Sequence, residues 1–203
     1  MTRFQTLLTS ALLSLTLTPS AQATTLVDQG IAMRDFATNL LWLDLDQTNG
    51  LSPNAALSAF PNFRMATHGE VVTLFLNAGF DGQFEVPNTT TNFDAASLLT
   101  DLLGTTASFT VGGVPKTVGQ GWADDGNVFR EPFYEINYPS GQAPTGRFFG
   151  GNAFSNSGTQ AINGVGTFLV SQVPLPTTLP LLLSALALIG LQMRGKKRRA
   201  APA

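Results

Sequence analysis

Residues 63–71 read Phe63-Arg64-Met65-Ala66-Thr67-His68-Gly69-Glu70-Val71 and predict a short extended segment that passes directly into a helix. Thr67 and Glu70 have the spacing of a capping box, in which each side chain bonds to the backbone amide of the other residue. Apolar residues then recur at helical spacing as far as Ala78, and Gly79 follows in the position that commonly ends a helix. This stretch therefore predicts one helix of the domain and the strand before it.

Two further helices are predicted around this one, both before residue 104. Ser52-Pro53 supplies an N-cap and a first helical residue for a helix that ends at Phe60. Phe93–Leu103 shows helical spacing of its apolar residues, with Asn92 as the expected cap.

Strands are predicted on both sides of the helices, and the second half of the chain consists of strands and loops. The segments are Thr25–Asp28, Ile31–Arg34, Leu41–Leu45, Ser108–Val111, Val114–Val118, Val128–Tyr138 and Gly164–Val170. Gly112-Gly113 joins two of them as a hairpin, and Pro132 predicts an edge or a break in another. We therefore expect an α+β fold, with the helices of the first half packed on antiparallel strands and a loop-rich β second half.

The two ends of the chain have the features of export signals. Residues 1–23 combine a basic start, an apolar segment and a small-x-small cleavage site at Ala21 and Ala23, which predicts a secretory signal peptide. Near the other end, Leu179–Met193 is uncharged and would cover only about 22 Å as a helix, less than a hydrocarbon core of about 30 Å. A basic stop signal follows, formed by Arg194, Lys196, Lys197, Arg198 and Arg199.

The order of parts in residues 173–203 resembles a known sorting signal. The motif Val173-Pro174-Leu175-Pro176, a short apolar helix and a basic end closely resemble the VPLPA variant of the PEP-CTERM signals of Gram-negative bacteria, with Thr177 at a position where Ala is usual. The resemblance implies export by the Sec machinery and processing by an exosortase, with membrane contact in the precursor only. The expected product is one exported domain, residues 24–172, at the cell surface or outside the cell.

The composition of that domain excludes several classes of function. Removing both signals leaves five basic against thirteen acidic residues, a net charge near −8, which argues against a nucleic-acid partner. The absence of Cys excludes thiol catalysis and thiolate metal sites, and the single His68 excludes multi-histidine metal centres. His68 is also the only candidate base for a serine triad, and it lies inside the predicted capping box. We therefore expect a protein that is not an enzyme and has no cofactor, apart from a calcium ion considered below.

A second resemblance concerns the domain itself. Arg34-Asp35 through Trp42 and Arg64–Val71 resemble two motifs of an uncharacterised family that is distantly similar to C-type-lectin-like and formylglycine-generating-enzyme-like folds. Asn39 stands where that family usually has Gly, and both residues accept a left-handed backbone. The resemblance implies a C-type-lectin-like α+β fold. It carries no catalytic residues.

Two acidic segments are candidates for ligand chemistry. Asp44 and Asp46 begin a loop that fails the EF-hand template and leaves either an irregular calcium site or a solvated turn. Trp122 precedes Asp124 and Asp125, which is typical of a sugar site and equally of an ordinary β-turn. The natural neighbours of a sugar site here would be Tyr134, Tyr138 and Arg147.

The sequence thus favours an exported, non-enzymatic protein of the cell surface or extracellular matrix. The alternative is a lectin-like module that binds extracellular polysaccharide, with or without calcium.

Overall fold

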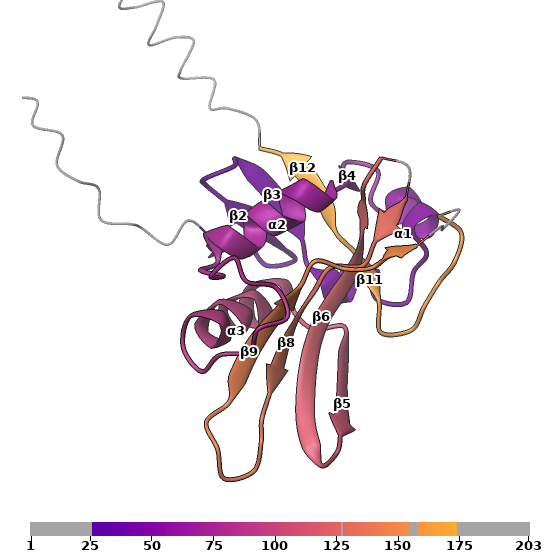
Figure 1. Ribbon diagram of the computed structural model, residues 1–203. Helices are drawn as coiled ribbons and strands as arrows, with labels where there is room; N and C mark the ends of the chain where they lie inside the picture. The colour runs from indigo at the N-terminus through magenta and orange to yellow at the C-terminus, as the bar shows by residue number, and fades with distance from the viewer. Residues whose placement is uncertain (1–25, 127, 155–157, 174–203) are drawn as a thin grey trace, which may run out of the picture. The chain divides into compact units, whose positions relative to one another are not determined.

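The computed structural model describes residues 26–126, 128–154 and 158–173 (Figure 1). The chain separates into two units, residues 1–171 and 172–203, and the fold described below is that of the first. The predicted signal peptide, the membrane helix at 179–193 and the basic tail lie outside the described residues, as does the sorting motif after Val173. No helix within the described ranges is both long and apolar enough to cross a bilayer.

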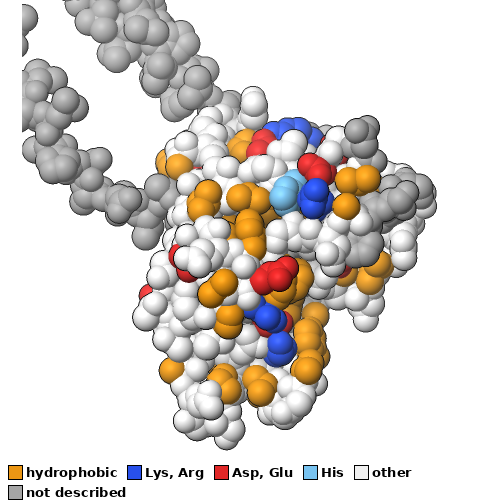
Figure 2. Space-filling model, viewed as in Figure 1, with side chains coloured by type: hydrophobic (Ala, Val, Ile, Leu, Met, Phe, Trp, Pro, Cys, Tyr) orange, Lys and Arg blue, Asp and Glu red, His pale blue; other side chains and the backbone are white. Residues whose placement is uncertain are grey.

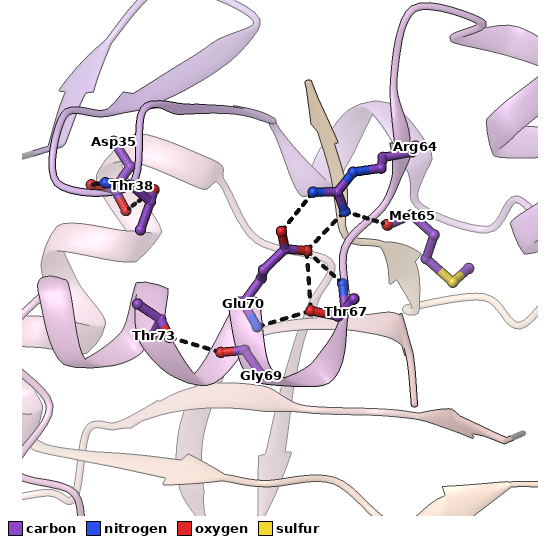
Figure 3. A network of polar contacts seen from close by, with 8 residues as sticks. All are labelled: Asp35, Thr38, Arg64, Met65, Thr67, Gly69, Glu70 and Thr73. Atoms are coloured by element: carbon purple, nitrogen blue, oxygen red, sulfur yellow. Dashed lines mark hydrogen bonds and ion pairs between the residues drawn. The ribbon is translucent and has the colours of Figure 1, made fainter. Parts of the chain in front are cut away.

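The three predicted helices are present. They are α1 (Pro53–Ala59), α2 (His68–Asn77) and α3 (Thr91–Leu103). The Ser52 side chain accepts from the Ala55 amide, and Thr67 and Glu70 form both bonds of the capping box, so both predicted N-caps are confirmed. Figure 3 shows that Arg64 extends the capping box by binding the Glu70 carboxylate.

The predicted cap of the third helix is wrong. Asn92 lies inside α3 and is fully buried, where its side chain accepts from the Asp81 amide and donates to the Val86 carbonyl. The Asn88 side chain instead accepts from the amides of Thr90 and Asn92. The N-cap residue itself is Thr90, whose side chain makes no capping bond. Hydrogen bonds from a loop residue such as Asn88 cannot be seen in helical spacing.

The strands form two sheets. The first has the order β1-β2-β3-β12-β4, from β1 (Leu26–Asp28), β2 (Ala32–Asp35), β3 (Leu40–Leu43), β12 (Leu169–Gln172) and β4 (Arg64–Met65). The predicted alternation over Leu41–Leu45 is only partly correct, because the strand ends at Leu43 and a 3-10 helix η1 (Leu45–Thr48) follows. Trp42 and Leu43 are both buried, so this strand is covered on two faces.

The second sheet is built around β6 (Val114–Asp124). Its order is β10-β7-β6-β8-β9, from β7 (Phe129–Arg130), β8 (Phe133–Asn137), β9 (Thr145–Phe149) and β10 (Ala153–Phe154), with β5 (Ala107–Val111) and β11 (Gly166–Thr167) also paired to β6. Gly112 and Gly113 both have positive φ, which confirms the predicted hairpin turn. In this second sheet the ladders are antiparallel except for β11 with β6. Together with the three helices, the two sheets confirm the α+β class.

The closing segment Gly164–Val170 was predicted as one strand, but the structure has two, β11 and β12. β11 pairs with β6 and β12 lies between β3 and β4, so the chain changes sheets at Phe168. The Phe168 amide donates to the Trp122 carbonyl and its ring packs edge-on against Trp42. The last strands therefore tie the two sheets together.

The main core is formed by residues of both sheets together with helices α2 and α3. Helix α3 packs against β8 and β9, and Figure 1 shows it beside these strands. Phe75 of α2 contacts the rings of Tyr134, Phe148 and Phe168, all of them fully buried. One face of β8 and β9 therefore packs against the helices. Because side chains alternate along a strand, the opposite face carries Phe133, Glu135, Arg147 and Phe149.

Two residues of the family-like motif have structural roles. Asp35 is fully buried, and its carboxylate accepts from the amide and hydroxyl of Thr38, a pair drawn in Figure 3. It also accepts from the Ala37 amide and from the side chain of Asn77. Asn39 has a φ of 57°, so the left-handed turn expected at this position is confirmed. The motif therefore fixes the turn between β2 and β3 onto α2.

Candidate functional site: a carboxylate-lined pocket at a strand break

A pocket of about 450 Å³ lies where β7 gives way to β8. Pro132 separates the two strands, as the sequence predicts, because proline has no amide to donate to the ladder. The pocket is lined by residues from four separate segments of the chain. These are Phe84 with Glu85, Gln120, Glu131 with Phe133, and residues 149–152. The loop before α3 thus meets three strands of the second sheet at this point.

Aromatic rings form one wall of the pocket. Phe133 and Phe149 are directly opposite on β8 and β9, and their rings stack with centroids 3.9 Å apart and an interplanar angle of 18°. The Arg147 guanidinium lies 4.3 Å from the centroid of the Phe149 ring. Phe84 completes the wall and is held by Phe80, at 4.8 Å between centroids. Apolar ring surface next to polar groups suits a ligand with both C–H and hydroxyl groups, such as a sugar.

Two carboxylates, Glu131 and Glu85, line the same pocket. Glu131 is half-buried, and burial raises its pKa, although a hydrogen bond from the Gln120 amide group acts in the opposite direction. Glu85 is exposed and has a φ of 66°, an uncommon left-handed backbone for a residue other than glycine. Its amide donates to the Phe148 carbonyl at 2.7 Å, which ties the loop to β9 and keeps Glu85 at the pocket.

The turn after β9 is shaped by two adjacent glycines. Gly151 has a φ of 81°, and a Cβ at this position would lie 2.5 Å from the carbonyl carbon of Glu131, so only glycine fits. The Gly150 carbonyl accepts a hydrogen bond from His68 Nε2 at 2.6 Å. His68 therefore braces the pocket wall, and that nitrogen is occupied as a donor.

Charged residues on the same face of β8 and β9 continue from the pocket, and Glu135 among them is only 4% exposed. Glu135 on β8 is paired with Lys116 at 3.1 Å and with Arg147 at 2.9 Å. Burial opposes ionisation of Glu135, but the hydrogen bonds from Lys116 and Asn137 and the charge of Arg147 outweigh it and lower its pKa. Figure 2 shows acidic and basic side chains next to hydrophobic ones over this part of the sheet.

The predicted sugar-stacking role of Trp122 is wrong. Its side chain is only 1% exposed, on the stretch of β6 that pairs with β11. Tyr134 is also fully buried, and its hydroxyl donates to the carbonyls of Leu99 and Gly104. Of the three expected neighbours, Tyr138 is exposed at the end of β8 and Arg147 alone touches a ring of the pocket wall.

The sequence left two interpretations of Asp124 and Asp125, a sugar site or an ordinary turn, and in the structure they lie where β6 ends in a turn. Asp124 accepts from the Gly126 amide at 2.9 Å. Asp125 pairs with Arg130 at 2.6 Å, and this hydrogen bond is the main cause of its lowered pKa. Neither residue lines the pocket.

Asp44 and Asp46 lie at the start of η1. Burial, together with the charges of Asp46 and Asp28, raises the pKa of Asp44 to about 6. Asp46 accepts from the side chain of Gln47 at 3.0 Å. Within the described residues, no group of three or more acidic or histidine side chains is arranged to hold a metal ion.

Comparisons with family models, with curated proteins and with solved structures found no match to this chain. The site residues that sequence reasoning missed are Glu85, Gln120, Glu131, Phe133 and Phe149. Two local signals pointed to their surroundings, namely Pro132 inside a strand pattern and the pair Gly150-Gly151 after the next strand.

Proposed function

We propose that the exported domain is a non-catalytic module that binds polysaccharide in the pocket at the β7–β8 break. The observation that carries this proposal is the combination of stacked aromatic rings with carboxylate and amide groups in one cavity of sugar-sized volume. The only histidine is engaged with the Gly150 carbonyl, which argues against its use as a catalytic base. A C-type-lectin-like fold is consistent with the α+β architecture and with the structural role of the Asp35 motif.

A glycan array probed with the secreted protein tests this proposal. Phe149→Ala should lose most of the binding, because it removes a ring of the pocket wall. Phe109→Ala is the matched control, since Phe109 is 46% exposed on β5 and does not line the pocket. Equal binding by both variants, or no binding by the parent protein, would contradict the assignment. Thermal melting of the parent protein in calcium and in a chelator shows whether calcium binds and stabilises the fold.

We also propose that residues 173–203 sort the protein to the cell surface and are processed by an exosortase. This proposal is supported by three features in order: the Val173-Pro174-Leu175-Pro176 motif, the short apolar segment and the basic end. Deleting these residues should release the protein from the surface, as measured by fractionation and intact-mass analysis. The N-terminal signal should still be removed from the shortened protein, which shows that export itself is intact. If this protein then remains at the same location as the full chain, the tail is not a sorting signal.

A further inference from the structure

Among the described residues, no Lys or Arg side chain of the domain forms an ion pair with the two pocket carboxylates, Glu85 and Glu131. Two cations touch other lining residues: Arg130 donates to the Gly151 carbonyl at 3.4 Å, and Arg147 lies on the Phe149 ring. The domain contains only five Lys or Arg residues, and all of them are described. Four form ion pairs, and every one of their partners lies outside the pocket: Arg64 with Glu70, Lys116 and Arg147 with Glu135, and Arg130 with Asp125. The fifth, Arg34, lies 4.2 Å from the centroid of the Phe36 ring and bonds to Asn39.

We infer that the pocket selects sugars that carry a free ammonium group, that is, de-acetylated amino sugars, over neutral sugars and uronic acids. This inference rests on the proposed polysaccharide-binding function and names the ligand class of the same site. Glu131 and Glu85 would supply the counter-charges that the ammonium group needs, and the rings would contact the apolar face of the sugar.

Three properties of the pocket support this choice. A half-buried carboxylate such as Glu131 loses hydration, and a ligand cation restores favourable interactions with its ionised form. A uronic acid would instead bring a third carboxylate close to the first two, which is unfavourable. Aromatic rings also attract cations, and the rings of Phe84 and Phe133 line the same pocket as the two carboxylates.

The charge of the whole domain acts in the same direction. Thirteen acidic residues against five basic ones attract a polycationic chain over long range and repel a polyanionic one. Long-range attraction is not specific to a site, however, so the test must separate it from recognition in the pocket.

Isothermal titration of the full protein with three oligomers of equal length provides that test. The ligands are glucosamine, N-acetylglucosamine and glucuronic acid oligomers, at about pH 6, where amines are charged and ordinary carboxyls are ionised. The glucosamine oligomer should bind about tenfold more tightly than its acetylated counterpart, as expected for one charge-assisted hydrogen bond. Glu131→Gln and Glu85→Gln should each weaken binding of the glucosamine oligomer more than binding of its acetylated counterpart, so that most of the preference is lost. Asp101→Asn is the control, because it removes one negative charge at an exposed position of α3, outside the pocket.

The possible results separate the two proposals. Equal or tighter binding of the neutral or acidic oligomer would overturn the charge selection and leave polysaccharide binding standing. A glucosamine preference that persists in the Glu131→Gln/Glu85→Gln double variant, or that Asp101→Asn reduces as much, would assign it to net charge and overturn the pocket. Binding of none of the three would overturn the proposed function itself.

Discussion

The carboxylate of Glu70 accepts hydrogen bonds from Nη1 and Nη2 of Arg64, at 2.8 and 2.6 Å, and from the Thr67 amide at 2.8 Å. The bonds from Arg64 are the main cause of a pKa lowered to about 2 from an ordinary 4.5. A carboxyl whose pKa is depressed by folding stabilises the folded state above its unfolded pKa, and this contribution disappears as pH falls toward the folded pKa. The window here runs from about pH 4.5 down to about pH 2.

Glu70→Gln should therefore lower the free energy of unfolding by about 1–2 kcal/mol at neutral pH and by much less near pH 2. The range is below the full value of the pKa shift, because the Arg64 side chain is half exposed and water screens the pair. Urea unfolding of both proteins at several pH values measures the difference. The exposed Asp101→Asn variant should show a small, nearly constant difference, and a Glu70→Gln effect that does not change with pH would contradict this account.

At the scale of elements, the approach of α3 to β9 depends on Gly146. A Cβ on this residue would lie 2.1 Å from the Asn92 carbonyl oxygen and 2.4 Å from the Phe93 Cα, both of them backbone atoms of α3. Gly146 also exchanges two backbone hydrogen bonds with Asn88, at 2.9 and 3.1 Å. The helix can therefore rest on the sheet only where the strand lacks a side chain.

Gly146→Ala should destabilise the protein by at least about 3 kcal/mol, because the clash is with backbone that cannot rotate away. Gly69→Ala is the matched control, since Gly69 lies in α2 with open space around it, and replacing a helical glycine should stabilise by up to about 1 kcal/mol. Thermal melting of the two variants compares them directly. A tolerated Gly146→Ala would mean that α3 does not pack as closely as described.

For the whole molecule, the order of strands makes the end of the domain indispensable. β12 lies between β3 and β4, and β11 pairs with β6, so residues 166–172 contribute to both sheets. Pairings between strands so distant in sequence form late and are costly in loop entropy. The first sheet cannot close until the last strand has been synthesised.

A chain that ends at Ile162 should therefore lose cooperative unfolding, whereas one that ends at Val173 should keep it. Tryptophan fluorescence in urea reports the difference, because Trp42 and Trp122 are both buried next to the affected strands. A cooperative transition in the shorter chain would show that the core is stable without β11 and β12.

The sequence alone was sufficient for features that depend on neighbouring residues. The caps at Ser52 and Thr67, the Gly112-Gly113 turn and the break at Pro132 are local, since backbone geometry and short-range hydrogen bonds determine them. The α+β class follows from the same local patterns. For these elements, only boundaries shifted by a few residues.

Tertiary structure alone decided which faces are covered and which residues meet. Trp122 was a candidate ring for a sugar site, yet it is buried on the part of β6 that pairs with β11 from the end of the domain. Alternation within β6 carries no information about that distant strand. The pocket likewise joins Glu85, Gln120, Glu131 and Phe149, which are brought together by strand pairing across tens of residues. Side-chain period determines which residues share a face of a strand, but only the packing of distant elements determines whether that face is core, surface or site.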